Sequence, residues 1–222
     1  MFYLTLAIVF ALLEAYFVHL RFTKGEYVAK PAVMILLLCW TLSMIPSHWS
    51  LHAAIFFSLL GDIFLMIDLD KMFLPGLVAF LLAHLAYIGY FSEQMLAAKL
   101  GHVFILALIL FVISIFILRP VVGSLLRGPT RSRNLVGPVL IYGTIICIMT
   151  FSSILTLFDV RWSLHAGSLV AVGALLFLFS DVILAWSKFL KEIPHGRVVN
   201  ILTYHAGQIG IVSGCILQHA SD

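Results

Sequence analysis

Charged residues are scarce in this sequence. Of its 222 residues, 13 are lysine or arginine and 10 are aspartate or glutamate, so charged residues make up 10% of the chain. Soluble domains contain about 25% charged and 45–50% apolar residues, whereas 63% of this chain is hydrophobic. This composition excludes a mainly water-soluble protein. It predicts an integral membrane protein whose residues 1–222 form a single transmembrane domain.

Cysteine is also scarce, and several common site motifs are missing. The three cysteines lie within apolar segments without a CxxC spacing, which indicates neither a disulfide framework nor a cysteine-based zinc site. The sequence contains no HExxH, GxSxG or Walker A motif, the signatures of zinc proteases, serine hydrolases and P-loop nucleotidases. Its basic residues form no continuous stripe, and this disfavours nucleic-acid binding.

Long apolar runs fill most of the chain. A helix needs about 20 apolar residues to cross a bilayer, and eight segments predict an all-α fold, a bundle of about eight transmembrane helices. The first segment lacks the basic start of a signal peptide and is expected to remain as a spanning helix. Pro31 is expected to open the second helix, where a missing N–H is harmless, and the basic segment 119–134 is expected to be a loop. The predicted spans are residues 1–20, 31–46, 49–68, 73–92, 102–118, 136–157, 163–186 and 198–218.

The basic residues are distributed unevenly over the connections. With eight spans, the odd-numbered loops lie on one side of the membrane and both termini on the other. Because basic loops stay in the cytoplasm, we expect cytoplasmic odd-numbered loops and both termini outside. The compact chain leads us to expect a bacterial inner membrane. The odd-numbered loops hold 11 of the 13 basic residues, all except Lys99 and Arg161: Arg21, Lys24, Lys30, Lys71, Arg119, Arg127, Arg131, Arg133, Lys188, Lys191 and Arg197.

Three acidic residues lie well inside the predicted spans. Asp62 in FSLLGDIFLM and Asp181 in LFLFSDVILA have similar surroundings, and the third is Glu14. A carboxylate at membrane depth is costly and usually functional, so the pair could be a proton relay, an ion site, or the acid and base of a hydrolase. At 1.5 Å rise per residue, these three acids and Tyr204 lie in one layer roughly 10–14 Å from the cytoplasmic edge. Each could instead serve only as a hydrogen bond between helices.

Other polar side chains share helix faces with this layer or lie deeper. His84 and Tyr87 are three residues apart, and Tyr204 and Gln208 are four apart, so each pair lies on one face of its helix. They could orient water or substrate, or only pack. Lys188 follows Asp181 by two turns and could attract a lipid phosphate or anchor the helix end. The aspartates and His84 give only weak support to a metal site.

Several segments, in order and spacing, resemble the YhhN-like lysoplasmalogenase family of multi-span membrane proteins. The resemblance runs through nearly the whole chain and is weakest in the first span and at 119–135. It implies hydrolysis of the vinyl-ether bond of lysoplasmalogens to a fatty aldehyde and glycerophosphoethanolamine or glycerophosphocholine, without a metal or organic cofactor. It also implies that the family's paired aspartates are Asp62 and Asp181. The segments are Lys30-Pro31, FSLLGD at 57–62, FLLAHLAY at 80–87, Tyr142, GALLFLFSDVILAWSKF at 173–189 and YHAGQ at 204–208.

The two buried acids suit this chemistry. Vinyl-ether hydrolysis begins with protonation of the carbon distal to the ether oxygen, and water then adds to the oxocarbenium-like cation. Two carboxyls in a low-dielectric pocket divide into a proton donor and an anion that stabilises the cation. We therefore hypothesise that Asp62 and Asp181 are an acid–base pair, with the individual roles open. Tyr204, Gln208 and His84 would orient water or the lysophospholipid substrate among the membrane lipids, and Lys188 would bind its phosphate.

Two other classes of function remain as alternatives. A proton-coupled transporter of lipids or small solutes would also use midplane acids. The repeat of WSLHA at 49–53 and 162–166, each preceding an aspartate, is either a trace of a parallel duplication or a chance match. Gly61 is the only glycine or proline beside either acid, which disfavours the broken helices of transporters. A receptor or scaffold would have no need of the paired acids.

Overall fold

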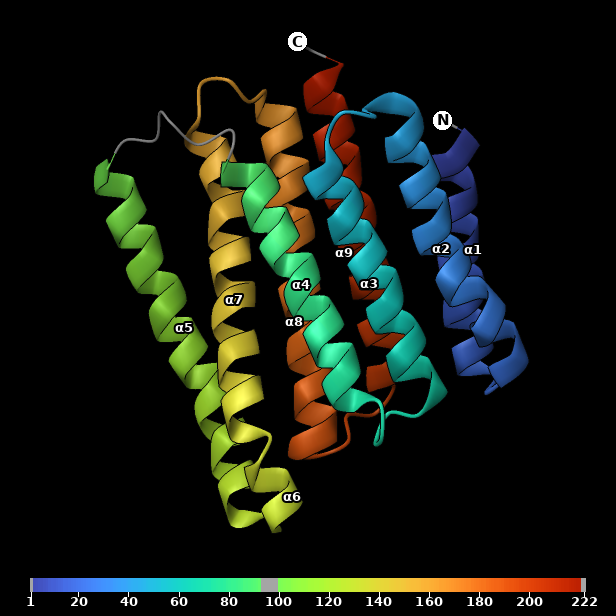
Figure 1. Cartoon of the computed structure of the whole chain (residues 1–222), viewed down its shortest axis with the longest axis vertical. Helices are drawn as coiled ribbons and strands as arrows, with labels where there is room; N and C mark the ends of the chain where they lie inside the picture. The colour runs from blue at the N-terminus through green and yellow to red at the C-terminus, as the bar shows by residue number, and fades with distance from the viewer. Residues whose placement is uncertain (1, 93–99, 221–222) are drawn as a thin grey trace.

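The computed structural model describes residues 2–92 and 100–220, and within these ranges all of the regular secondary structure is helical (Figure 1). Eight of the helices are long, which confirms the predicted all-α bundle. A short helix, α6, and a 3₁₀ turn at Thr156–Phe158 lie in the connections on either side of α7. The helices are α1 (Phe2–His19), α2 (Thr23–Met44), α3 (Trp49–Ile67), α4 (Phe73–Ser92), α5 (Leu100–Arg127), α6 (Thr130–Arg133), α7 (Val136–Leu155), α8 (Leu164–Phe189) and α9 (Gly196–His219).

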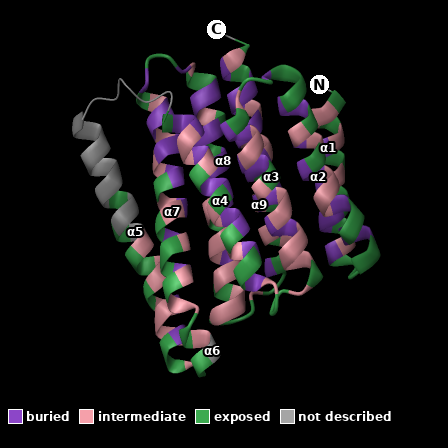
Figure 2. Cartoon of the chain, viewed as in Figure 1, coloured by how far each residue is buried: buried purple, intermediate pink, exposed green. Residues whose placement is uncertain are grey.

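The surface of the bundle matches the interior of a membrane. Within the described ranges, 6 helices are long and apolar enough to cross a membrane, namely α1, α2, α3, α4, α8 and α7 with its 3₁₀ turn. Large apolar side chains such as Leu12 (58%), Phe116 (75%) and Val172 (56%) are exposed, and exposed residues line the outward faces in Figure 2. Such wide apolar exposure is unusual for a soluble protein. The chain is an integral membrane protein.

The predicted start of the second helix is wrong. Helix α2 begins at Thr23, so Pro31 lies inside it. The polar residues Lys24, Glu26 and Lys30 resemble a loop in the sequence, but Glu26 is buried and contacts Arg197 of α9. Because partners on neighbouring helices satisfy these groups, the polar first turns remain helical. A proline is tolerated inside such a helix when its surroundings compensate for the lost hydrogen bond.

The predicted loop at 119–134 is also largely wrong. Helix α5 continues through Pro120 to Arg127, and α6 follows at Thr130. Val121 and Leu125 on this extension are buried against Val139 of α7. This apolar packing stabilises the helix beyond the predicted end of the span.

Glycines bring the two most closely packed helices together. A Cβ atom at Gly207 of α9 would lie 2.8 Å from the backbone oxygen of Gly173 of α8, and a Cβ at Gly214 would lie 2.7 Å from that of Ala166. Small residues allow this backbone approach between membrane helices. The contact places the face of α9 that carries Tyr204 beside α8. Both chain termini lie at the end of the bundle opposite α6 (Figure 1).

Candidate active site

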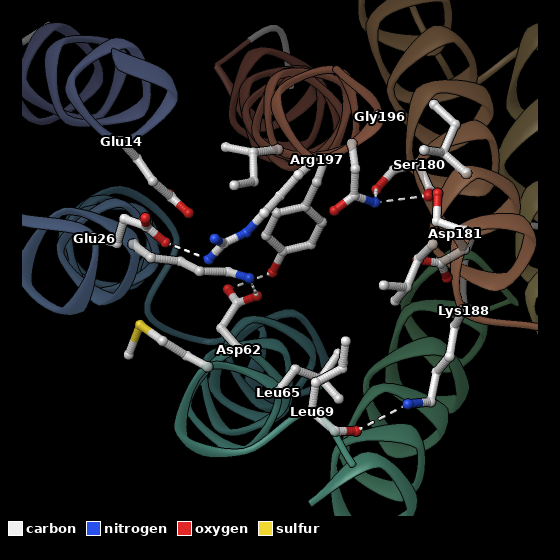
Figure 3. A pocket seen from close by; sticks show the side chains of 18 of the residues that line it. Glu14, Glu26, Asp62, Leu65, Leu69, Ser180, Asp181, Lys188, Gly196 and Arg197 are labelled. Atoms are coloured by element: carbon white, nitrogen blue, oxygen red, sulfur yellow. Dashed lines mark hydrogen bonds and ion pairs between the residues drawn. The ribbon is translucent and has the colours of Figure 1, made fainter. Parts of the chain in front are cut away.

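A cavity of about 530 Å³ contains most of the predicted site residues. It lies mainly among α2, α3, α8 and α9 and reaches the α3–α4 and α8–α9 connections, where Asp68 and Glu192 line it. Asp62 of α3 and Asp181 of α8 project from different walls (Figure 3). The layer expected from the sequence therefore faces one space. The other predicted residues in its lining are Glu14, Lys188 and Tyr204.

Asp62 is buried between a lysine and a tyrosine. Only 1% of its surface is exposed. The hydroxyl of Tyr204 donates a hydrogen bond of 2.7 Å to Asp62 Oδ2, and Lys30 Nζ lies 3.1 Å from Asp62 Oδ1. Lys30 was expected to lie in a loop and was not predicted as a site residue, but it lines the cavity. Burial of an unpaired charge is costly. The Lys30 ammonium offsets this cost because it pairs with the Asp62 carboxylate.

Asp181 has a different set of partners. The hydroxyl of Tyr142 on α7 donates a hydrogen bond to Asp181 Oδ2. His84 Nε2 on α4 lies 3.0 Å from the Tyr142 oxygen and 3.9 Å from Asp181 Oδ2. Among the ion pairs of the described residues, Asp181 has no lysine or arginine partner. A polar chain thus runs from the cavity through Tyr142 to the fully buried His84.

Tyr87 and Gln208 pair with each other and not with the cavity. The hydroxyl of Tyr87 donates to Gln208 Oε1 at 2.6 Å, and Gln208 Nε2 donates to Ser58 Oγ at 3.0 Å. All three side chains are buried. Neither residue of the pair is part of the cavity lining, and His84 reaches it only through Asp181 and Tyr142. In this arrangement they brace α3, α4 and α9 behind the two acids.

Two further pairs, each of an acidic and a basic side chain, lie around Asp62. The Glu14 carboxylate is hydrogen-bonded to His205 Nε2, and both residues are 1% exposed. Glu26 is paired with Arg197, whose side chain is 65% exposed (Figure 3). Asn200 donates to Ser180 Oγ at 2.9 Å across the α8–α9 contact. Except for Glu14, these residues were not predicted as site residues.

Lys188 is held at the mouth of the cavity. Its Nζ lies 2.9 Å from Asp70 Oδ1 and 3.2 Å from the backbone oxygen of Leu69, so it ties the end of α8 to the α3–α4 connection. The backbone N–H groups of Lys71 and Asp70 donate to Asp68 Oδ1, each at 3.0 Å, and lower the pKa of the Asp68 carboxyl. The mouth therefore carries both signs of charge. In the ranges that the structure describes, no group of three histidine, cysteine, aspartate or glutamate residues could hold a metal ion.

The helices and this cavity define a polytopic membrane protein with an acidic pocket inside its bundle. The chain belongs to the YhhN family, whose model matches residues 25–215. This confirms the resemblance found in the motifs. The matched range excludes the first helix but contains both aspartates.

Several mammalian proteins are similar to the chain. Lysoplasmalogenase TMEM86B of Mus musculus is 30% identical over 184 residues, 82% of this chain and 71% of that protein. Lysoplasmalogenase TMEM86B of Homo sapiens is 31% identical over 159 residues, 72% of this chain and 60% of that protein. Lysoplasmalogenase TMEM86A of Homo sapiens is 30% identical over 169 residues, 74% of this chain and 64% of that protein. No solved structure matches the chain.

Proposed function

We propose that this protein is a lysoplasmalogenase, which hydrolyses the vinyl-ether bond of a lysoplasmalogen. The products are a fatty aldehyde and glycerophosphoethanolamine or glycerophosphocholine. The observation that carries the proposal is the cavity shared by Asp62 and Asp181, in a chain whose relatives are named lysoplasmalogenases. The paired carboxyls have unlike partners, which suits unlike roles in an acid–base reaction.

In the proposed mechanism Asp181 is the general acid. Protonation of an enol-ether carbon needs a neutral acid, and Asp181 has no ammonium or guanidinium partner among the described ion pairs. As Asp181 delivers its proton to the distal vinyl carbon, it becomes a carboxylate that accepts the Tyr142 hydrogen bond. His84 orients that hydroxyl from behind. General acid catalysis of this kind contributes about 10²–10⁴-fold to a rate.

Asp62 is the proposed anion. Its partners Lys30 and Tyr204 suit a carboxylate, since both are hydrogen-bond donors. A fixed negative charge stabilises the cation that develops at the carbon next to the ether oxygen. It also accepts a proton from the water that adds there. In the collapse of the resulting hemiacetal, protonated Asp62 returns its proton to the glycerol oxygen as the bond from that oxygen to carbon breaks. The Asp181 carboxylate takes the proton of the hemiacetal hydroxyl as the aldehyde forms, so both acids regain their starting states.

The mouth of the cavity suits a zwitterionic head group. Lys188 and Arg197 offer cationic groups to a phosphate, and Asp68 and Glu192 offer carboxylates to an ammonium. The Asp70 side chain, the partner of Lys188, is 87% exposed, and that of Lys188 is 12% exposed. Water competes for the Asp70 carboxylate, so a phosphate can take its place beside Lys188. The vinyl ether, just below the head group, would then lie at the depth of the two aspartates.

An aldehyde-release assay tests the function. The purified protein in detergent is given ethanolamine and choline lysoplasmalogens, beside an ester-linked lysophospholipid. We expect aldehyde from both lysoplasmalogens and little turnover of the ester. A transporter would release no aldehyde, because it moves its substrate without cleaving it.

Variants test the mechanism. We expect folded Asp62→Asn and Asp181→Asn proteins each to lose about 10²–10⁴-fold in kcat. Full aldehyde release by either variant would remove that aspartate from the mechanism. Tyr27→Phe is a control outside the site, since the Tyr27 hydroxyl donates to the backbone oxygen of Met66 at 3.3 Å and Tyr27 is not in the cavity lining.

We also propose that the end of the bundle with the cavity mouth is cytoplasmic in a bacterial inner membrane. The basic residues of that end and the positive-inside rule support this orientation. Alkaline phosphatase fused after residue 222 should be active, because it folds only outside the cytoplasm. If green fluorescent protein is fused at the same position and fluoresces, the C-terminus lies in the cytoplasm and the proposed orientation is wrong.

A further inference from the structure

Asp181 lies at the border between two faces of α8. On one side, Ser180 and Leu184 line the polar cavity with it. On the other side, Leu178 and Val182 line a small void of about 60 Å³ between α5, α7 and α8. Asp181 is part of both linings, so its carboxyl separates polar from apolar space.

A second small void meets the same carboxyl. It measures about 50 Å³ and lies between α4, α7 and α8, with Phe80 and Leu184 in its lining. Both of these residues also line the polar cavity. Tyr142 and Asp181 are the only polar side chains around this void among the described residues. The packing around Asp181 is therefore loose on its apolar side.

An apolar groove continues the first void to the surface of the bundle. The groove has a volume of about 660 Å³ and lies between α5 and α7. It shares Ser114, Leu118 and Cys147 with the void beneath Asp181. Arg119 is its one charged lining residue among those described. The polar cavity, the first void and the groove thus form a series that runs past Asp181 to the lipid-facing side of α5 and α7.

A flexible side chain stands between groove and void. A Cβ atom at Gly143 of α7 would lie 2.7 Å from Leu118 Cδ2 of α5, so Leu118 rests directly on the glycine. A change of its rotamer is the movement that would open the groove to the void. A hydrocarbon chain could therefore pass where the side chain now lies.

We propose that the hydrocarbon chain of the substrate leaves the cavity at Asp181 and lies in the groove between α5 and α7. This inference rests on the proposed lysoplasmalogenase function. The vinyl carbon that receives the proton also carries the hydrocarbon chain, so the acid must sit where the polar part of the substrate meets the apolar part. Asp181 occupies such a border. The head group then remains at the charged mouth while the chain lies sideways among the bilayer lipids.

Alkylation of the native cysteines tests the position of the chain without requiring turnover. Cys147 lines the groove and the void, whereas Cys39 is exposed on α2, away from both. The probe is a saturated 1-O-hexadecyl lysophosphoethanolamine, which has no vinyl ether to cleave, added to the protein in detergent with a maleimide. At ten times its dissociation constant, we expect about tenfold slower alkylation of Cys147 and an unchanged rate at Cys39. Equal rates at Cys147 with and without the lipid, or equal slowing at both cysteines, would overturn the proposal.

Substitution of the groove supplies a second test. Cys147→Trp fills the groove, and Ile141→Trp places the same ring at a 58% exposed position of α7 outside the lining. We expect Cys147→Trp to lower kcat/KM about tenfold or more for a hexadecenyl lysoplasmalogen and less than about twofold for an octenyl one. Ile141→Trp should change neither. Equal losses for both chain lengths would contradict the placement.

The two tests also separate this inference from the proposed function. If the wild-type protein releases aldehyde but the lipid does not protect Cys147, the proposed function is supported and the proposed position of the hydrocarbon chain is wrong. Wild-type protein that releases no aldehyde but protects Cys147 binds the lipid as proposed and lacks the activity.

Discussion

Lys30 Nζ lies 3.1 Å from Asp62 Oδ1, and this ion pair joins α2 to α3 inside the bundle. The Lys30 side chain is 17% exposed and that of Asp62 is 1% exposed. Lys30 Nζ also lies 5.7 Å from the centre of the Tyr204 ring, which faces it from α9. A cation and an aromatic ring from two other helices therefore fix the position of the carboxylate that we propose as the catalytic anion.

Lys30→Met should destabilise the protein and abolish its activity. The substitution keeps the length of the side chain but leaves Asp62 as an unpaired buried charge, which costs about 3–5 kcal/mol. Thermal unfolding in detergent measures the loss of stability, and aldehyde release measures the activity.

The double variant Lys30→Met with Asp62→Asn separates the two effects. Removing both charges should restore most of the melting temperature, because the two substitutions are coupled, while the activity stays absent. Additive losses of stability in the double variant would show that the ion pair contributes nothing to the fold.

That Asp62, Asp181 and Tyr204 lie at one depth could be predicted from the sequence, but the partners of the aspartates could not. A lone acid in an apolar run stands out, and helical rise gives its depth. Which helix supplies Lys30 or Tyr142 depends on the rotation and packing of neighbouring helices, and no local pattern encodes these. The same limit explains α2, where Glu26 and Lys30 resemble a loop until Arg197 and Asp62 are placed beside them.

The eight helices followed from hydrophobic run length, whereas two boundaries did not. Pro31 was expected to open a helix and the segment 119–134, which contains Pro120, was expected to be a loop, but both prolines lie inside helices. In a membrane bundle, packing against neighbours outweighs the local preference of proline. Val121 and Leu125 supply such packing after Pro120.

Tyr142→Phe should lower kcat by about 10- to 150-fold and leave KM nearly unchanged. The hydroxyl contacts Asp181 and His84, and a hydrogen bond to a charged group contributes about 1.5–3 kcal/mol. Because Tyr142 acts through Asp181, the loss should appear in the chemical step. Steady-state kinetics in H₂O and D₂O measure it, since proton transfer to carbon gives a solvent isotope effect.

The control for this variant is Tyr87→Phe. It removes a hydroxyl that bonds Gln208 behind the site and should reduce stability more than kcat. If Tyr142→Phe raised KM and left kcat unchanged, the hydroxyl would have a role in substrate binding and not in proton transfer.

Gly207→Ala should destabilise the α8–α9 contact. The new Cβ would lie 2.8 Å from Gly173 O and 2.9 Å from Phe177 N, and these backbone atoms cannot move independently of their helix. Overpacking of this kind costs about 1–3 kcal/mol. Gly89→Ala on α4 is the matched control, because nothing lies within 4 Å of its Cβ position, and it should be neutral or stabilise by about 0.5–1 kcal/mol. Equal melting temperatures of the two variants would show that α8 and α9 can separate without cost.

The stability contributed by Asp68 should depend on pH. Backbone N–H groups of Lys71 and Asp70 bond the carboxylate and lower its pKa below the usual 3.8. A group whose pKa is lower in the folded state stabilises the protein above the unfolded pKa, and this stabilisation is lost as the pH falls through the folded pKa. Asp68→Ala should therefore melt at a lower temperature than the wild type at pH 6, and the difference should disappear in acid below the folded pKa. Glu192→Ala, which changes another carboxyl at the mouth of the cavity, serves as the comparison. A melting difference for Asp68→Ala that persists unchanged into strong acid would mean that the side chain stabilises the connection by packing and not by its charge.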